Sequence, residues 1–295
     1  MKIAVIGAGA VGLFLAASFK RPGQDVVLVT KRAEQAALLE DRGISLKGKT
    51  EAEKKVSTQV GMGTKPFDLI VCAVKSYDVP SAVAMGESLA YNQTRWLFVQ
   101  NGMGHLEEIA HLTGRVAVGV LEYGLFKEGD AVVEVRGLGS LKIAPFKRMT
   151  EQDIAVIGNA ADGQILHIHT FPAYKPILEK KLIANACINP LTAITGERNG
   201  ALIEQQGYMA AMKSVFHEAV AVLERDDDEA LWHYVVAVCK KTANNQSSML
   251  VDYQQGRKLE LDAILGYLIR LGEKKQIHTP RLLFLYQLLS RGETR

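Results

Sequence analysis

A lysine and two asparagines recur at four-residue intervals in the mostly apolar stretch EKKLIANACINP, residues 179–190. On an α-helix each step of four residues advances about 40° beyond a full turn, so Lys181, Asn185 and Asn189 fall within an arc of roughly 80°. An amine can donate a proton to an oxygen that gains negative charge, and amides can orient the groups without adding charge. We interpret this stripe as a candidate catalytic face; the alternative is a stripe that faces solvent.

The N-terminus carries the glycine spacing of a nucleotide-binding loop, G-x-G-x-x-G. The sequence GAGAVG follows a short β-branched run and precedes a helical pattern. The first glycine permits a tight turn, the second lets the backbone approach a pyrophosphate, and the third lets helix and strand pack closely. The start of the helix offers free N–H groups to phosphate. We expect a dinucleotide here; the alternative is a turn that serves packing alone. The expected contacts are Gly7, Gly9, Ala10, Val11 and Gly12.

The end of the second predicted strand favours NADP(H) over NAD(H). An NAD site usually has an acidic residue at this point, which holds the ribose 2′-hydroxyl. This chain instead has VLVTKR, with Lys31 and Arg32 and no carboxylate before Glu34. Arg32 is the preferred contact because a guanidinium grips phosphate in a bidentate manner. Lys31 is the near alternative, and both residues could equally be exposed cations at the start of a helix.

Two more polar residues follow predicted strands. Lys75 comes directly after FDLIVCAV, and Asn101 comes directly after RWLFVQ. Ligands of open α/β sheets bind beyond the carboxyl ends of the strands, so both residues are candidates for the same nucleotide site. The alternatives are a surface lysine and an asparagine that serves a turn before Gly102.

The elements that must position these residues fall into two groups. Strand and helix patterns alternate from KIAVIG to RVAVGVLEY, as in a parallel sheet covered on both faces. Short runs separated by glycines follow from residue 123, and we expect them as antiparallel strands at the edge of that sheet. Helical patterns then cover residues 173–189, 208–225, 228–244, 259–271 and 280–290.

We therefore predict an α/β fold with two domains. Residues 1–170 form a Rossmann-type, doubly wound NADP-binding domain, and residues 171–295 form an all-helical domain for substrate binding and catalysis.

The composition excludes several classes of protein. The net charge is only +3, from 35 basic and 32 acidic residues, and no basic run stands out, so we expect no nucleic-acid partner. Three dispersed cysteines in apolar surroundings indicate a reducing compartment, and no stretch is apolar enough for a membrane span. We predict a cytoplasmic protein, and the sequence leaves open whether it forms a homodimer.

Other chemistry-bearing residues are interpreted as structural. His167 and His169 have the spacing of metal ligands, but no third ligand cluster lies near them in the sequence, so we expect no metal. Cys187 lies among apolar neighbours without an evident base, and we interpret it as a packing residue.

The chain resembles the ketopantoate reductase (2-dehydropantoate 2-reductase) family. The resemblance covers most of the chain, in the family's order, and its two long helical blocks are more specific than the glycine loop. Two positions depart from the family pattern: Leu259 stands where threonine is frequent, and Leu265 where asparagine is common. The matching segments are GAGAVG, AVKSYD, QNGMG, KLIANACINPLTAITGERNG, NNQSSMLVDYQQGRKLELDAILG and HTP.

The resemblance implies the activity and the roles of particular residues. It implies that NADPH reduces the ketone of 2-dehydropantoate to pantoate, on the route to pantothenate and coenzyme A. The family's catalytic lysine matches Lys181, its substrate-binding serine matches Ser248, and its acidic partner matches Glu260. The helix asparagines match Asn185 and Asn189, the strand-end asparagine matches Asn101, and the lysine near the cofactor matches Lys75.

These roles fit the chemistry of ketone reduction. Hydride transfer leaves negative charge on the carbonyl oxygen, and Lys181 is the predicted general acid. We expect Glu260 to bind the free hydroxyl of the substrate and to contact the lysine only secondarily. Ser247 is the neighbouring alternative to Ser248, and either serine could cap a helix. Pro190 should end the stripe, because its ring disfavours the helical conformation at Asn189.

Two other functions remain open from the sequence. One is the reduction of another 2-keto acid, and the other is a non-catalytic NADP-binding regulator.

Overall fold

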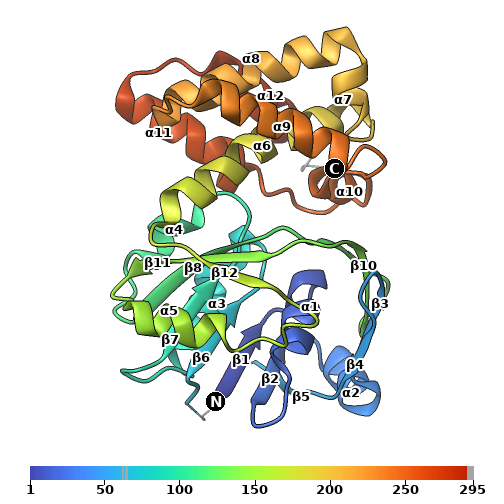
Figure 1. Cartoon of the computed structure of the whole chain (residues 1–295), viewed down its shortest axis with the longest axis vertical. Coiled ribbons are helices and arrows are strands. Elements are labelled where there is room, and N and C mark those ends of the chain that lie inside the picture. The colour runs from blue at the N-terminus through green and yellow to red at the C-terminus, as the bar shows by residue number, and fades with distance from the viewer. Residues whose placement is uncertain (62, 64–65, 291–295) are drawn as a thin grey trace. The chain divides into compact units, whose positions relative to one another are not determined.

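The computed structural model describes residues 1–61, 63 and 66–290, and they form two compact units. The first unit comprises residues 1–100 and 106–177, and the second comprises residues 101–105 and 178–295 (Figure 1). The short segment 101–105 therefore packs with the helical part of the chain, although it follows a strand of the first unit in sequence.

The first unit contains a main sheet of eight strands in the order β12-β11-β8-β7-β6-β1-β2-β5. The strands from β8 to β5 are parallel, β11 is antiparallel to β8, and β12 is parallel to β11. The expected Rossmann-type sheet is thus confirmed. The strands are β1 (Lys2–Ile6), β2 (Asp25–Thr30), β5 (Ser57–Val60), β6 (Leu69–Cys72), β7 (Arg95–Phe98), β8 (Arg115–Leu121), β11 (Leu141–Lys147) and β12 (Ile168–Thr170).

A second sheet of four strands lies in the same unit, and the sequence did not predict it. Its order is β4-β3-β10-β9, with strands β3 (Ile44–Gly48), β4 (Ala52–Lys54), β9 (Gly124–Lys127) and β10 (Val132–Gly137). The expectation that the strands after residue 123 extend the edge of the main sheet is therefore wrong for β9 and β10, and right for β11.

Helix α1 (Ala10–Phe19) lies between these two sheets. It contacts β1 and β2 of the main sheet and β3, β9 and β10 of the smaller one (Figure 1). Residues 12–19 are all buried, which explains why α1 carries no polar face. The other helices of this unit are α2 (Ala33–Arg42), α3 (Val79–Glu87) and α5 (Glu151–Gly158); α4 (His105–Ile109) starts at the last residue of segment 101–105.

The second unit is helical, as expected. Helix α6 begins at Tyr174 and continues to Thr195, so the prediction that Pro190 ends the helical stripe is wrong. A π-helical turn, Asp262–Gly266, precedes α11. The other helices are α7 (Ala201–Glu204), α8 (Gln206–Leu223), α9 (Asp228–Lys241), α10 (Ser248–Gln254), α11 (Tyr267–Lys275) and α12 (Pro280–Ser290).

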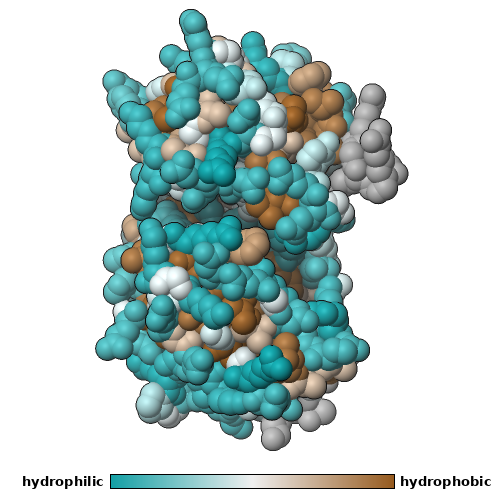
Figure 2. Space-filling view, turned by 90° about the vertical axis from the view of Figure 1, so that its right-hand side faces the viewer, coloured by the Kyte–Doolittle hydropathy of each residue, from teal (hydrophilic) through white to brown (hydrophobic). Residues whose placement is uncertain are grey.

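The surface is mixed in character. Figure 2 shows a face on which hydrophilic residues predominate and hydrophobic residues form small patches. Among the described residues, no helix is both long and apolar enough to cross a membrane.

A buried carboxylate joins α5 to two strands of the main sheet. The Asp153 carboxylate accepts hydrogen bonds from Arg95 and Arg115, each at 2.8 Å, and from the backbone N–H and hydroxyl of Thr150. Thr150 in turn caps α5 by accepting from the Asp153 N–H. Burial raises the pKa of the Asp153 carboxyl, but the Thr150 and Arg115 hydrogen bonds and the Arg95 charge together hold it below its ordinary value.

We predict that Asp153→Asn lowers the free energy of unfolding by about 3 kcal/mol at neutral pH, because two partly buried guanidinium groups lose their charged partner. The folded-state pKa is depressed, so this contribution is complete above the unfolded-state pKa of about 3.9 and disappears as the pH falls through the folded-state value. Urea unfolding over a pH series measures it, with the exposed Asp41→Asn as control. A difference from wild type that stays constant into acid would contradict this account.

Candidate active site

The glycine loop makes its tightest contact within itself. Gly7 has φ +107°, a conformation that favours glycine, and a Cβ on Gly12 would lie 1.7 Å from the Gly7 carbonyl oxygen. A Cβ on Gly9 would meet nothing within 4 Å, and α1 begins directly after Gly9 without a side-chain cap. The loop thus leaves open space beside the unbonded N–H groups of a helix start, which fits a dinucleotide pyrophosphate. Ala10 and Val11 form the first turn of α1.

The two cations at the end of β2 are both held by carboxylates. The Lys31 ammonium lies 2.9 Å from Asp78, which precedes α3. The Arg32 guanidinium pairs with Asp130, between β9 and β10, and also bonds to Gln35 on α2. Both cations are largely exposed, so a bound phosphate can reach them, but it must compete with these carboxylates.

A buried glutamine, Gln100, links the ends of β6 and β7, and it was not among the predicted site residues. The Gln100 side chain follows β7 and donates to the carbonyl oxygens of Cys72, at 2.8 Å, and Val74, at 3.1 Å. It therefore holds the end of β7 beside the end of β6, where the half-buried Lys75 begins a short 3₁₀ turn. An amide after a strand was visible in the sequence, but nothing there distinguished Gln100 from Asn101.

In the second unit the structure brings Asn101 and Glu260 together across 159 residues of sequence. The Asn101 amide donates to the Glu260 carboxylate at 3.2 Å, and Glu260 is buried. The same loop is anchored next to this contact, because the N–H groups of Met103 and Gly104 both donate to the carbonyl oxygen of Ala263. Ala263 lies in the π-helical turn, a form that is frequent at functional sites.

The polar stripe of α6 runs from partial exposure into the interior. Lys181 and Asn185 are half-buried, and Asn189 is buried. Near the end of the helix, the Thr192 hydroxyl lies 2.7 Å from the Ser247 hydroxyl and bonds to the carbonyl oxygen of Asn189. This contact places the last part of the stripe beside the start of α10.

The structure separates the roles of the two serines at the start of α10. Ser247 is the N-cap: it is buried and its hydroxyl accepts from the N–H of Leu250 at 3.0 Å. Ser248 is the first residue of the helix and is exposed. The capping alternative thus applies to Ser247, and Ser248 is available to a ligand.

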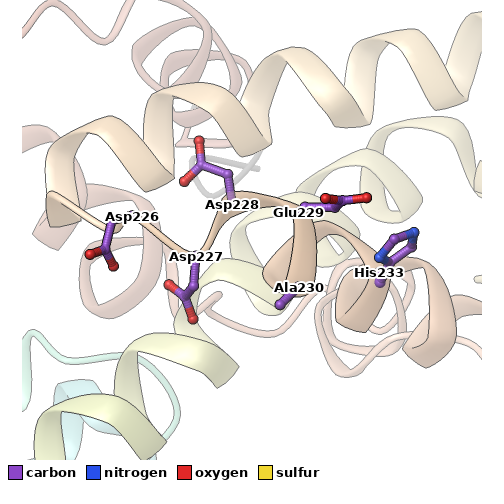
Figure 3. Close-up of a pocket in the computed structure, with 6 residues that line it drawn as sticks. All are labelled: Asp226, Asp227, Asp228, Glu229, Ala230 and His233. Carbon is purple, nitrogen blue, oxygen red and sulfur yellow. The ribbon is translucent and has the colours of Figure 1, made fainter.

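The described residues also form a hollow that contains none of the predicted site residues. It lies at the junction of α8 and α9, where Figure 3 shows acidic side chains that point in different directions. Arg225 pairs with Asp227 of this hollow, at 2.8 Å, and also with Glu179 of α6, at 3.1 Å. No group of three or more metal-ligating side chains is found among the described residues. The lining residues are Asp226, Asp227, Asp228, Glu229, Ala230 and His233.

The three cysteines are buried, and none of them forms a disulfide. Burial raises the pKa of the Cys72 thiol to about 12 and also raises the pKa of the Cys187 thiol, which suits packing residues and not nucleophiles.

The sheet topology and the glycine loop define a dinucleotide-binding domain, and a helical unit follows it. Two family profiles cover nearly the whole chain: "Ketopantoate reductase PanE/ApbA" matches residues 3–148, and "Ketopantoate reductase PanE/ApbA C terminal" matches residues 174–293. The chain belongs to the ketopantoate reductase family, as the sequence segments indicated.

Similar proteins extend over the full chain. The 2-dehydropantoate 2-reductase of Bacillus subtilis (strain 168) is 38% identical, over 97% of this chain and 95% of that protein. The enzyme of the same name from Listeria innocua is 33% identical, over 98% and 96%.

Solved structures match the whole fold as well. A probable 2-dehydropantoate 2-reductase from Bacillus subtilis has a TM-score of 0.88 at 36% identity and covers 99% of this chain and 100% of its own. A D-mandelate dehydrogenase with NADH and anilino(oxo)acetate has a TM-score of 0.92 at 22% identity, over 100% and 99%, and shows similarity of fold alone.

The loop geometry predicts opposite phenotypes for two glycines. Gly12→Ala should lower the free energy of unfolding by about 2 kcal/mol or more, because its Cβ would collide with backbone. Gly9→Ala should leave stability near wild type but weaken NADPH binding, because its methyl group enters the open space beside the helix start. Urea unfolding and NADPH fluorescence titration measure the two effects. Unaltered NADPH affinity in Gly9→Ala would show that the pyrophosphate binds elsewhere.

Proposed function

We propose that this chain reduces the ketone of 2-dehydropantoate to pantoate with NADPH as cofactor. The observation that carries the proposal is that the similarity to 2-dehydropantoate 2-reductases extends over both units, so that the nucleotide loop and the polar helix stripe occur together. A regulator that only senses the nucleotide would have no need of the second set of residues. A cytoplasmic location stays a prediction.

The residues present suit NADPH. The glycine loop would hold the pyrophosphate, and Arg32, with Lys31 beside it, would hold the 2′-phosphate at the end of β2. Lys75 and Asn101 would contact the nicotinamide half of the cofactor. When bound, NADPH supplies the hydride that reaches the carbonyl carbon.

Lys181 is the proposed proton donor. As the carbonyl carbon accepts a hydride, its oxygen gains negative charge, and the Lys181 ammonium gives that oxygen a proton to form the alcohol. The amine then regains a proton from water. Asn185 and Asn189, one and two turns further along α6, would orient the ammonium and the substrate oxygens without adding charge.

Glu260 and Ser248 are the proposed contacts with the hydroxyl and the carboxylate of the substrate. The buried Glu260 carboxylate, already held by the Asn101 amide at 3.2 Å, can accept a hydrogen bond from the substrate hydroxyl. The exposed Ser248 hydroxyl can donate to the substrate carboxylate. A site built to accept a hydroxyl group should reject 2-keto acids that lack it.

A substrate panel assayed with NADPH and with NADH tests the function. We expect the highest kcat/KM, measured by loss of NADPH absorbance, for 2-dehydropantoate with NADPH. A higher value for another 2-keto acid would assign the chain to that substrate, and tight NADPH binding without turnover of any acid would indicate a regulator.

Lys181→Ala should lower kcat by about 10²- to 10⁴-fold and leave the dissociation constant of NADPH near its wild-type value. Lys180→Ala is the matched control, because Lys180 is the preceding residue on α6, is exposed, and lies over the Tyr234 ring at 4.3 Å. Stopped-flow turnover and NADPH titration measure both quantities. Wild-type kcat in Lys181→Ala would reject this lysine as the donor.

The two serines of α10 should separate binding from stability. Ser248→Ala should raise KM for 2-dehydropantoate about tenfold with little change in unfolding free energy. Ser247→Ala should lower that free energy by about 1–2 kcal/mol, because it removes the helix cap and the Thr192 contact. Steady-state kinetics and urea unfolding of both variants test this assignment. If KM rose in Ser247→Ala but not in Ser248→Ala, and the stability of Ser247→Ala were unchanged, the substrate contact would be assigned to Ser247.

A further inference from the structure

Two cations of the first unit converge on one carboxylate oxygen. Asp130 lies in the turn between β9 and β10, and its Oδ1 accepts from Arg32 Nη2 and from Lys127 Nζ, the latter at 3.1 Å. Arg32 follows β2 of the main sheet, whereas Lys127 ends β9 of the small sheet. This oxygen therefore marks a position where an anion is held by a guanidinium and an ammonium group at once.

A buried glutamine ties this position to the glycine loop. The Gln35 amide group donates to the carbonyl oxygens of Ala8, at 3.0 Å, and Asp130, at 2.8 Å. Its own oxygen accepts from Arg32 Nη2 at 3.3 Å, and the residue is only 4% exposed. The turn that carries Asp130 is thus fixed beside the loop expected to hold the pyrophosphate.

The end of β2 is the place where this fold holds the adenosine ribose. NADPH and NADH differ only there: NADPH has a phosphate monoester with a charge of about −1.5 to −2, and NADH has a neutral hydroxyl. A phosphate that reaches Arg32 enters the position that Asp130 occupies. A neutral hydroxyl does not need that position.

We propose that Asp130 determines cofactor preference in this chain: its carboxylate competes with the 2′-phosphate for Arg32 and Lys127, and it thereby reduces the preference for NADPH over NADH. The proposal rests on the proposed use of NADPH. It also assigns Lys127 as a further cation of the 2′-phosphate site, in addition to Arg32 and Lys31.

The competitor is charged under working conditions. The Arg32 hydrogen bond, and after it the Lys127 hydrogen bond, hold the pKa of the Asp130 carboxyl below its ordinary value. Water reaches the site, since the side chains of Arg32 and Asp130 are 53% and 31% exposed. Solvent screening therefore makes the competition moderate and dependent on salt.

Direct binding measurements on the full chain test the proposal. Dissociation constants for NADPH and NADH are measured by fluorescence titration for wild type, Asp130→Asn and the control Glu34→Gln, which removes an exposed carboxylate from the first turn of α2. Asp130→Asn should tighten NADPH binding by about tenfold at low salt and change NADH binding by less than about twofold. The gain should shrink in high salt, and Glu34→Gln should have a much smaller effect on NADPH.

Two further variants establish that the effect operates through the cations. In an Arg32→Ala background, Asp130→Asn should lose most of its effect on NADPH. Lys127→Met should weaken NADPH binding and leave NADH binding near wild type, and this variant decides the question if Asp130→Asn fails to fold.

The outcomes distinguish this proposal from the proposed function. Weaker NADPH binding in Asp130→Asn, or equal changes for both cofactors, would overturn the competition while NADPH use stands. Equal affinity of wild type for NADPH and NADH, unaltered by Arg32→Ala, would overturn the proposed NADPH use and this proposal together.

Discussion

The burial of helix α6 on most of its circumference is the constraint on which the proposed chemistry depends. Residues 182–184 and 186–193 are buried, and along this run only Lys181 and Asn185 remain half-exposed. A helix packed in this way cannot rotate without moving apolar side chains into water, at roughly 25 cal/mol for each Å² exposed. The Thr192–Ser247 contact further fixes it against α10. Lys181 therefore leaves the helix in a set direction, which a proton donor requires.

The two units use different means to prepare for a ligand. In the first unit the expected phosphate contacts are backbone groups of a glycine loop, whose shape is set by the contact between Gly7 and Gly12. In the second unit the expected contacts with the substrate are side chains, and the π-helical turn fixes the loop that carries Asn101 through two hydrogen bonds to Ala263. The cations at the end of β2, Lys31 and Arg32, are already paired with the carboxylates of Asp78 and Asp130. Binding of an anion there is an exchange between carboxylate and phosphate, and its free energy is the difference between the two.

Features of the fold that depend on local sequence patterns could be predicted from the sequence. Strand and helix periodicity and the glycine spacing were enough for the Rossmann-type sheet and the helical second unit, and the long motifs were enough for the family. Strand patterns do not state which sheet a strand joins, so β9 and β10 were assigned to the wrong one. The end of α6 was missed because burial of the helix on both sides of Pro190 outweighs the local effect of the proline. The site residues stay predictions, although the contact of Asn101 with Glu260 agrees with them. Asp130 lies 98 residues from Arg32, and no local signal links the two.

Chemical rescue of Lys181→Ala by small amines tests the central claim most directly. With NADPH and 2-dehydropantoate at saturation, turnover by this variant should rise in proportion to the concentration of ethylammonium, which can donate a proton. Tetramethylammonium at the same ionic strength carries the charge without a proton and should give no increase. Turnover that is independent of every primary amine, while both substrates still bind with wild-type dissociation constants, would contradict the assignment of Lys181 as the proton donor.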